Sequence, residues 1–318
     1  MDYRSLGNTG LSVSRICFGS LALSPLQSSM SIQERVDLIL FAMDMGVNII
    51  DTAEIYQNYD LLQRILKISS SEPHIVSKSY AYQYSGMKYS VELALRELKC
   101  DHISIFMLHE QETELTLRGH SDALEYLCDA KAQGLISAIG ISTHAVEVVN
   151  AAANMIEVDV IHPLYNRKGI GIIDGKSDDM LRAISKAHKN GKGIIGMKAL
   201  AGGNLSRQSE EQLKHVRDLQ VLDSVAIGMS SEQEIRNNCL MFDRLPVPNE
   251  IKSFVMSQER RIHIDEWCSG CGECQRKCSQ GAIQISNGKA KVDYDKCVCC
   301  GYCGTVCRDF CIKIVRVV

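Results

Sequence analysis

Short runs of apolar and β-branched residues alternate with longer stretches of helical periodicity over the first 245 residues. Such runs are typical of buried strands, whereas apolar residues three and four apart indicate one face of a helix. Gln33–Met45, for instance, places Val36, Ile39, Leu40 and Met43 on one side. The predicted strands are Arg15–Phe18, Asn48–Ala53, His74–Ser79, Ile103–His109, Ile136–Ser142, Val158–Tyr165, Gly193–Leu200 and Ser224–Ser230.

This order of elements predicts an α/β fold, a (β/α)8 TIM barrel. Helical stretches separate the strands, and Glu232–Met241 follows the eighth, with Ser230-Ser231 as candidate N-cap. A doubly wound sheet is the alternative, but no Gly-x-Gly-x-x-Gly turn follows Arg15–Phe18. A hairpin that turns at Asn8-Thr9-Gly10 precedes the barrel.

Two prolines, Pro246 and Pro248, end the periodic pattern and mark a domain boundary. We therefore expect a barrel domain at 1–245, a linker at 246–261 and a second, small α+β domain at 262–318. The last of these repeats itself with a shift of 29 residues, so that two copies of one unit are present. The cysteines of the first copy, Cys268, Cys271, Cys274 and Cys278, correspond to Cys297, Cys300, Cys303 and Cys307 of the second.

Composition narrows the classes of partner. The chain has 45% apolar and 23% charged residues and a net charge of −3, so we expect no nucleic-acid partner. It holds no apolar run of about 18 residues, so we expect no membrane span. The N-terminal residues do not resemble a secretory signal. Of the 14 cysteines, ten lie between Cys268 and Cys311. In a reducing compartment, the cytoplasm, such crowding indicates metal ligands and not disulfides.

Each cysteine run has the spacing C-x2-C-x2-C-x3-C, which is typical of bacterial ferredoxins with two [4Fe–4S] clusters. In that arrangement the fourth cysteine of each run binds the other cluster. We thus expect Cys268, Cys271, Cys274 and Cys307 on one cluster, and Cys297, Cys300, Cys303 and Cys278 on the other. Two zinc sites are the alternative, although no histidine is interleaved. Cys299 and Cys311 have no counterpart in the repeat and are expected to be packing residues.

Four polar residues stand at the ends of successive predicted strands: Asp51, Tyr56, Lys78 and His109. The carboxyl ends of barrel strands form the catalytic face. Within Asn48–Tyr56, Ile75–Ser79 and Ile105–His109 these residues resemble the catalytic tetrad of aldo-keto reductases. The N-terminal hairpin, with Arg4, Leu6, Gly7, Thr9 and Gly10, resembles that family too, and the resemblance covers residues 1 to about 245.

Carbonyl reduction requires a hydride donor and a proton donor, and Tyr56 is the expected general acid. A free tyrosine has a pKa of about 10. We expect the Lys78 ammonium, oriented by Asp51, to lower that pKa towards 7. His109 would donate a hydrogen bond to the carbonyl oxygen of the substrate. Tyr80, Tyr82 and Tyr84 are candidates for lining the substrate pocket.

The resemblance also implies a nicotinamide coenzyme. Asp51 and the following residues would contact it: Gly19, Ser20, Leu21, Ser142, Thr143, His162, Met197, Lys198, Leu200, Gly202, Gly203, Gly228, Ser230, Glu234 and Asn238. Ser230 stands where that family carries an Arg or Lys for the 2′-phosphate, so both NADP and NAD remain open.

Three functions follow as hypotheses. The first is NAD(P)-dependent reduction of an aldehyde, ketone or sugar carbonyl, in which the cluster-binding unit supplies electrons or serves for docking. The second is one-electron, cluster-driven reduction or dehydration of a carbonyl substrate. The third is an electron-transfer protein whose barrel only binds nucleotide. A redox partner protein is compatible with each of these three functions. Residues 262–318 carry eight Lys and Arg against six Asp and Glu, and two oxidised clusters would bring their net charge to roughly −2. This is not the strongly acidic surface of a freely diffusing ferredoxin, so we expect the unit to dock on the barrel, with one cluster near the face that holds Tyr56 and His109. A tethered module is the alternative.

Overall fold

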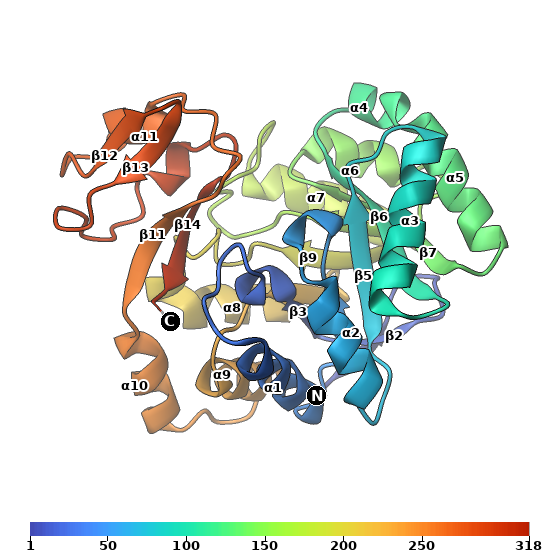
Figure 1. The fold of residues 1–318 in the computed structure, drawn as a ribbon, viewed down its shortest axis with the longest axis horizontal. Helices are drawn as coiled ribbons and strands as arrows, with labels where there is room; N and C mark the ends of the chain where they lie inside the picture. The colour runs from blue at the N-terminus through green and yellow to red at the C-terminus, as the bar shows by residue number, and fades with distance from the viewer. Residues whose placement is uncertain (318) are drawn as a thin grey trace.

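The computed structural model describes residues 1–317, and its centre is a closed barrel of parallel strands (Figure 1). The last barrel strand pairs with the first, Val225 opposite Ile16, which closes the ring. The (β/α)8 barrel predicted from the sequence is therefore confirmed. Its strands are β3 (Ile16–Gly19), β4 (Ile49–Asp51), β5 (His74–Ser79), β6 (Ile103–Gln111), β7 (Ile136–Thr143), β8 (Val160–Pro163), β9 (Gly193–Met197) and β10 (Ser224–Ile227).

Helices surround the barrel and bury apolar faces against it. The helices are α1 (Ile32–Asp44), α2 (Tyr59–Ile68), α3 (Tyr84–Leu98), α4 (Glu114–Gly119), α5 (Ser121–Ala132), α6 (Val146–Ala152), α7 (Ser177–Lys189), α8 (Ser209–Asp218) and α9 (Glu232–Phe242). The side chain of Ser231 accepts from the Glu234 amide and caps α9, as the sequence predicts. Among residues 1–317, no helix combines the length and apolar character that a membrane crossing requires.

The predicted N-terminal hairpin consists of β1 (Tyr3–Ser5) and β2 (Ser12–Ser14), which pair antiparallel. Its turn lies against the start of β9, where the Asn8 amide donates to the Gly191 carbonyl at 2.9 Å. Leu6 is fully buried and joins the apolar core inside the barrel. The hairpin thus closes the N-terminal end of the barrel and leaves the opposite face for a site.

The segment at 246–261 is more ordered than a plain linker. It contains α10 (Asn249–Ser257), and β11 (Arg260–Ile264) begins before the predicted domain boundary at residue 262. Pro248 is the N-cap of α10, so the proline that ends the barrel periodicity also starts a new helix.

The remaining residues form a small unit of two two-stranded sheets, which we call the C-terminal unit (residues 260–317). Its elements are β11, α11 (Glu273–Lys277), β12 (Ile283–Ser286), β13 (Lys289–Val292) and β14 (Ile312–Arg316). β11 pairs antiparallel with β14, and β12 with β13. Ile283 and Ile312, which correspond in the sequence repeat, are both buried in the unit's own core, against which most of its cysteines pack.

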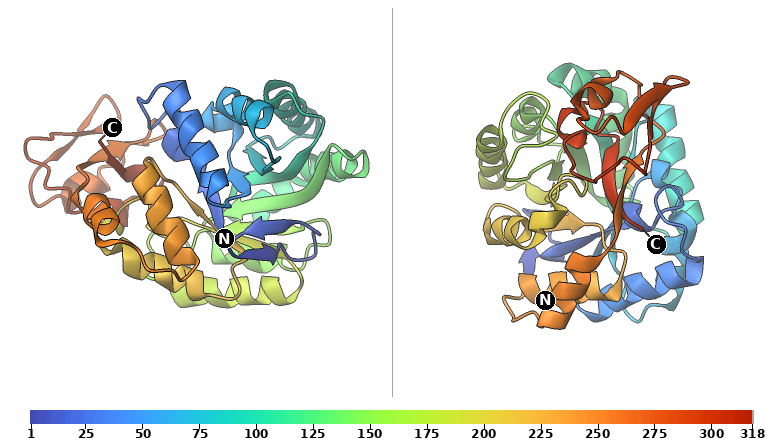
Figure 2. Two further views of the ribbon diagram at one scale, coloured as in Figure 1. Left: turned by 90° about the horizontal axis from the view of Figure 1, so that it is seen from below. Right: turned by 90° about the vertical axis from the view of Figure 1, so that its left-hand side faces the viewer.

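The C-terminal unit docks on the barrel through β14, as Figures 1 and 2 show. The Ile314 amide donates to the Gly202 carbonyl at 2.8 Å, and Arg316 Nη1 donates to the Ser230 carbonyl at 3.1 Å. A Cβ added at Gly203 would lie 2.0 Å from the Ile314 carbonyl oxygen, so only glycine permits this approach. The contacted loops follow β9 and β10, which places the unit on the C-terminal face. The expected docking is confirmed.

Candidate active site

The four residues predicted as a tetrad come together at the C-terminal ends of β4, β5 and β6. Lys78 Nζ lies 2.5 Å from Asp51 Oδ1 and donates to the Thr52 carbonyl at 2.8 Å. The same ammonium is 5.2 Å from the centre of the Tyr56 ring. The His109 ring meets the Tyr56 ring edge-on with centroids 6.1 Å apart. Asp51, Lys78 and His109 are buried, whereas Tyr56 is partly exposed.

Tyr80 is the one tyrosine of the predicted trio that lies beside the tetrad. Its ring stacks on His109 with centroids 4.3 Å apart. Tyr84 instead donates from its hydroxyl to Asp129 at 2.8 Å on α5, and Tyr82 packs edge-on against His120. These contacts lead to α5 and to the turn between α4 and α5, and a substrate-lining role for Tyr82 and Tyr84 stays a prediction.

The pKa of Tyr56 shifts in the direction opposite to the expected one. Burial raises it well above its usual value, and the Asp51 carboxylate raises it further. Lys78 does not reverse this because its charge is already paired with Asp51 at 2.5 Å. Burial likewise holds the pKa of His109 well below its usual value, and the Lys78 charge adds to this effect. At neutral pH the site therefore contains a protonated phenol and a neutral imidazole.

A cavity of about 280 Å³ extends from Asp51 and Tyr56 to Asn237 and Asn238 on α9. We call it the interdomain cavity, because β14 forms one of its walls. Most residues predicted to contact a coenzyme line it: Gly19, Leu21, His162, Met197, Lys198, Leu200, Gly202, Gly203, Gly228, Ser230, Glu234 and Asn238. The structure thus brings the tetrad tyrosine and these residues into one continuous space.

Three residues that were predicted to contact the coenzyme do not line the interdomain cavity of the described chain: Ser20, Ser142 and Thr143. Their hydroxyls serve the backbone instead. The Ser20 hydroxyl donates to the Asp51 carbonyl at 2.7 Å, and the Thr143 hydroxyl donates to the Gln111 carbonyl at 2.5 Å. The Ser142 hydroxyl accepts from the Glu110 amide at 2.8 Å. These side chains hold strand ends in place, and their direct contact with a coenzyme stays a prediction.

Sequence reasoning missed a polar chain next to the tetrad. Lys198 Nζ donates to His144 Nε2 at 2.6 Å, and His144 Nδ1 lies 3.3 Å from Glu110 Oε1. Lys198 and Glu110 both have positive φ, 60° and 49°, a strained conformation that clusters at functional sites. Glu110 directly follows His109, and His144 directly follows Thr143, so the strand-end rule could have identified both.

The C-terminal unit contributes side chains to the same region. The Phe310 ring lies 4.3 Å from Lys198 Nζ, and Lys313 Nζ lies at 4.3 Å from the same ring centre. Lys313 pairs with Asp265 at 3.3 Å. Phe310 and Lys313 line the interdomain cavity together with Tyr56. No sequence signal pointed to them, because their role depends on how the unit docks.

The cysteines of the first predicted cluster set lie close together. Burial raises the pKa of the Cys274 thiol, and the thiolates of Cys307, Cys268 and Cys271 raise it further. These are the four cysteines of the crossed set, with Cys307 contributed by the second run. Cys307 Sγ also lies 3.3 Å from Cys311 Sγ. Phe310, the residue before Cys311, lines the interdomain cavity.

In the second set, burial raises the pKa of Cys303 to about 12, and the thiolates of Cys300 and Cys297 add to the effect. The fourth cysteine of this set, Cys278, packs in the same small core and accepts from the Ala282 amide at 3.3 Å. Within residues 1–317, no three His, Cys, Asp or Glu side chains are grouped closely enough to hold a single metal ion. A cubane spreads its cysteines further, because each binds a different iron.

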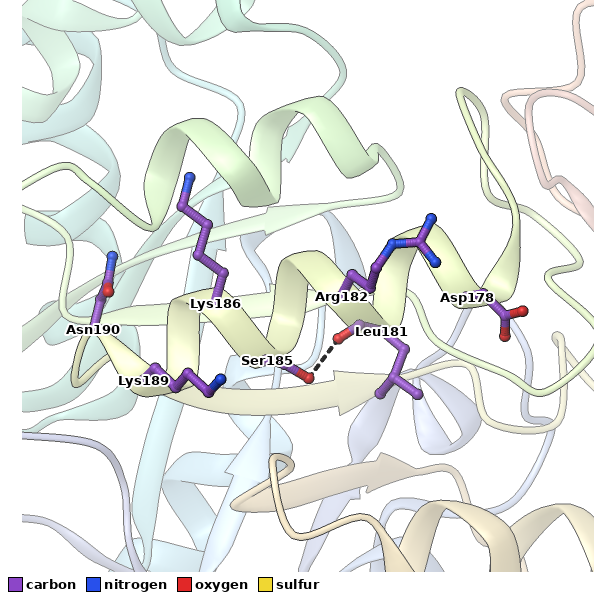
Figure 3. A pocket seen from close by; sticks show the side chains of 7 residues that line it. All are labelled: Asp178, Leu181, Arg182, Ser185, Lys186, Lys189 and Asn190. Atoms are coloured by element: carbon purple, nitrogen blue, oxygen red, sulfur yellow. Dashed lines mark hydrogen bonds between the residues drawn. The ribbon is translucent and has the colours of Figure 1, made fainter.

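A second hollow lies on the outer side of α7 and contains none of the tetrad (Figure 3). Its lining is Asp178, Leu181, Arg182, Ser185, Lys186, Lys189 and Asn190. The Ser185 hydroxyl donates to the carbonyl of Leu181 in the same helix at 2.7 Å. These are solvated positions along one helix, so this hollow is not a candidate active site.

Comparison with known proteins agrees with this geometry. Aldo-keto reductase YhdN of Bacillus subtilis is 23% identical over 182 residues, which cover 52% of this chain and 54% of that protein. This chain thus spans about half the length of that relative. A component of an ion-translocating oxidoreductase complex from Methanosarcina acetivorans is 36% identical over 47 residues, 15% of this chain and 18% of that protein.

A solved structure from Pseudomonas aeruginosa, assigned to the aldo-keto reductases, superimposes with a TM-score of 0.66 at 26% identity. The match covers 76% of this chain and 94% of that structure. A family profile described as "Aldo/keto reductase family" matches residues 15–267. That range contains the barrel, the tetrad and most of the interdomain cavity. The chain therefore belongs to the aldo/keto reductase family of oxidoreductases.

Proposed function

We propose that this protein is an NAD(P)-dependent reductase of a carbonyl substrate, an aldehyde, ketone or sugar, with Tyr56 as general acid. The observation that carries the proposal is the buried Lys78–Asp51 ion pair, 2.5 Å long, beneath a tyrosine that faces the interdomain cavity. An enzyme that adds a hydride to a carbonyl carbon must also protonate the oxygen. Tyr56 carries its proton at neutral pH and is the group placed to deliver it.

Each tetrad residue has a separate task in this proposal. Tyr56 gives its proton to the carbonyl oxygen as negative charge develops there. Lys78 then stabilises the resulting phenolate, at 5.2 Å from the ring centre, while Asp51 fixes the ammonium. His109 is neutral, so it keeps one N–H donor, and its Nδ1 has no hydrogen-bond partner among residues 1–317. It is available to orient the substrate oxygen.

The residues of the interdomain cavity fit a nicotinamide coenzyme, which would supply the hydride. His162 and Met197 would lie beside the nicotinamide, Lys198 near the pyrophosphate, and Gly228 to Asn238 around the adenosine. Gly202 and Gly203 line the cavity but are also covered by β14. At about 280 Å³ the cavity lies just below the range usual for drug-sized ligands.

We further propose that the C-terminal unit is a ferredoxin-like domain that holds two [4Fe–4S] clusters. Cys274 of the first run lies near Cys307 of the second run, which supports this proposal. The cysteine spacing predicts that the fourth cysteine of each run binds the cluster of the other run. The ligands would be Cys268, Cys271, Cys274 and Cys307 on one cluster and Cys297, Cys300, Cys303 and Cys278 on the other. Within residues 1–317 all 14 cysteines are free, which suits a reducing compartment such as the cytoplasm.

A second candidate function is one-electron reduction or dehydration of the carbonyl substrate, driven by the clusters. The observation that favours it is the position of Phe310, which follows the predicted ligand Cys307 and lines the same cavity as Tyr56. An external donor, such as a redox partner protein, would then supply electrons through the C-terminal unit.

The test begins with anaerobic purification and titration with NADH and NADPH, while bound nucleotide and the visible cluster absorbance are followed. We expect Tyr56→Phe to bind nucleotide within a few-fold of wild type and to reduce carbonyls at least ~10²-fold more slowly. Lys78→Met should behave in the same way. Retention of most of the turnover by Tyr56→Phe would contradict the assignment of the acid.

A further inference from the structure

Two arginines of the C-terminal unit face the end of the interdomain cavity at α9. Arg260 begins β11 and Arg316 ends β14, and the two residues lie directly opposite each other across the strand pair. Both line the cavity wall with Ser230 and Asn238 of the barrel. Like charges directly opposite on neighbouring strands are destabilising. An anion bound between them would remove that repulsion.

The hydrogen bonds of these arginines leave their charges unpaired within the described residues. Arg316 Nη1 donates to the Ser230 carbonyl at 3.1 Å, and Arg316 Nε is buried with no hydrogen-bond partner in residues 1–317. Arg260 donates to the carbonyls of Gln258 at 3.3 Å and Val255 at 3.1 Å. The partners found are neutral carbonyls, whereas a guanidinium binds most strongly to carboxylate or phosphate.

The barrel wall at this end contributes no competing charge pair among the described residues. Ser230 occupies the position at which a barrel cation would be expected. Glu234 is the carboxylate in this part of the wall, and its Oε2 accepts from the Ser230 amide at 2.8 Å and the Ser230 hydroxyl at 3.1 Å. That carboxylate is therefore held at the start of α9. A cation for an anionic ligand here has to come from the C-terminal unit.

We propose that Arg260 and Arg316 bind the 2′-phosphate of NADP(H), so that the C-terminal unit determines the choice of NADP over NAD. This inference rests on the proposed function, which places the adenosine of the coenzyme beside Ser230 and Asn238. The coenzyme then lies between two units of one chain, with its reactive end at the barrel tetrad and its phosphate on the docked sheet.

The test compares the affinity of the full-length, anaerobically purified protein for NADP⁺ and NAD⁺ by calorimetry. Arg316→Ala and Arg260→Ala should each weaken NADP⁺ binding by ~10-fold or more, the loss expected for a charge-assisted hydrogen bond, and leave NAD⁺ within ~2-fold. Arg261→Ala is the matched control, because Arg261 lies on the same strand and is exposed. It should change neither affinity.

Small probes separate a 2′-phosphate site from a general phosphate site. The wild type should bind 2′,5′-ADP more tightly than 5′-AMP, and Arg316→Ala should abolish the difference. Equal competition by inorganic phosphate would overturn the assignment to NADP. Equal affinity of the wild type for NADP⁺ and NAD⁺ would overturn this inference alone and leave the proposed reduction standing. Binding of neither nucleotide would overturn both.

Discussion

At the scale of single residues, the proposed reaction assigns two tasks to two different groups: one keeps the proton on Tyr56, and the other stabilises the phenolate that forms when the proton leaves. Burial and the Asp51 charge keep the proton on Tyr56. In the resting site the positive charge of Lys78 is offset by the carboxylate of Asp51, which lies 2.5 Å away. In the proposed reaction, the ammonium becomes important only when the phenol loses its proton to the substrate. Such an arrangement stabilises charge at the moment it forms, which is the general requirement for electrostatic catalysis.

The pKa directions of Tyr56 and His109 predict a flat pH profile. The pKa of Tyr56 is raised, so the phenol keeps its proton below and around pH 9. The pKa of His109 is lowered, so the imidazole stays neutral above pH 6.5. We expect single-turnover carbonyl reduction at saturating coenzyme to be constant from pH 7 to 9. A fall centred between these values that disappears in Tyr56→Phe would show that the phenol titrates there.

Lys198 should give coenzyme binding its pH dependence. Burial lowers its pKa to about 7, and the Lys313 charge contributes to the shift. The charged or titratable groups facing it are His144, Glu110, Lys313, Asp265 and Lys78. The ammonium is charged below pH 7 and neutral above it, so affinity for the coenzyme pyrophosphate should fall by about tenfold between pH 6 and 8.

Lys198→Arg is the variant that checks this prediction, because arginine remains charged throughout this range. Its affinity for NADP⁺ should lose the component of pH dependence that belongs to the protein. The ionisation of the coenzyme's own phosphate remains in both proteins and serves as an internal control. Identical pH dependence in wild type and variant would assign the effect to the ligand.

The sequence predicts the tetrad because each member ends a barrel strand or follows one closely. Glu110 and His144 also lie at the ends of barrel strands, directly after the predicted site residues His109 and Thr143, so the same rule predicts them as site residues. The direction of the Tyr56 pKa is a different matter, because it depends on how much water the fold removes from the phenol. That quantity belongs to the packed structure and is not encoded in residue spacing.

At the scale of elements, the two cysteine runs predict an exchange of ligands. Cys278→Ala should damage the cluster bound by Cys297, Cys300 and Cys303, and spare the one bound by its own run. Iron content should fall from about eight per chain towards half, with one spectroscopic cluster signal retained. Loss of the signal from the first run instead would contradict the crossed ligation.

Cys299→Ala and Cys311→Ala are the controls for that experiment. Neither cysteine has a counterpart in the sequence repeat, and both should keep the full iron content. Cys311 is the stricter control, because its sulfur lies 3.3 Å from Cys307 Sγ and could change the properties of the neighbouring cluster without removing iron. Zinc in place of iron in the wild type would contradict the cluster assignment itself.

Regular elements were predicted well where the apolar run was continuous. β5 matches its predicted bounds, His74–Ser79, because all its residues from Ile75 to Ser79 are buried. β8 is shorter than predicted, Val160–Pro163 and not Val158–Tyr165. Pro163 has no amide donor for the ladder, so the strand ends there and continues only as an isolated bridge between Leu164 and Met197. The helix α10 was missed because the prolines before it were interpreted only as a boundary.

At the scale of the whole molecule, the docked C-terminal unit and the barrel together form the walls of one cavity. The sequence predicts both domains and their contact, through the barrel pattern, the cysteine repeat and the charge balance. It does not predict that β14 is the contacting strand or that Phe310, Lys313 and Arg316 face the barrel. These positions depend on how the C-terminal unit is oriented on the barrel. That orientation is held by the Ile314 amide, which donates to the Gly202 carbonyl, and by the Arg316 side chain, which donates to the Ser230 carbonyl.

Gly203 should be the residue on which docking depends most strongly. Gly203→Ala places a Cβ 2.0 Å from the Ile314 carbonyl oxygen and requires a left-handed backbone, since φ is 87°. Gly10→Ala is the matched control, because φ there is 79° and nothing lies within 4 Å of the added carbon. Both variants carry the left-handed strain of roughly 1–2 kcal/mol, but only the first separates β14 from the barrel.

Hydrogen exchange at the Ile314 amide, which donates to the Gly202 carbonyl at 2.8 Å, reports that separation. We expect exchange there to accelerate by at least ~10-fold in Gly203→Ala and to stay unchanged in Gly10→Ala, whereas equal exchange in the two variants would show that β14 is not held by this contact.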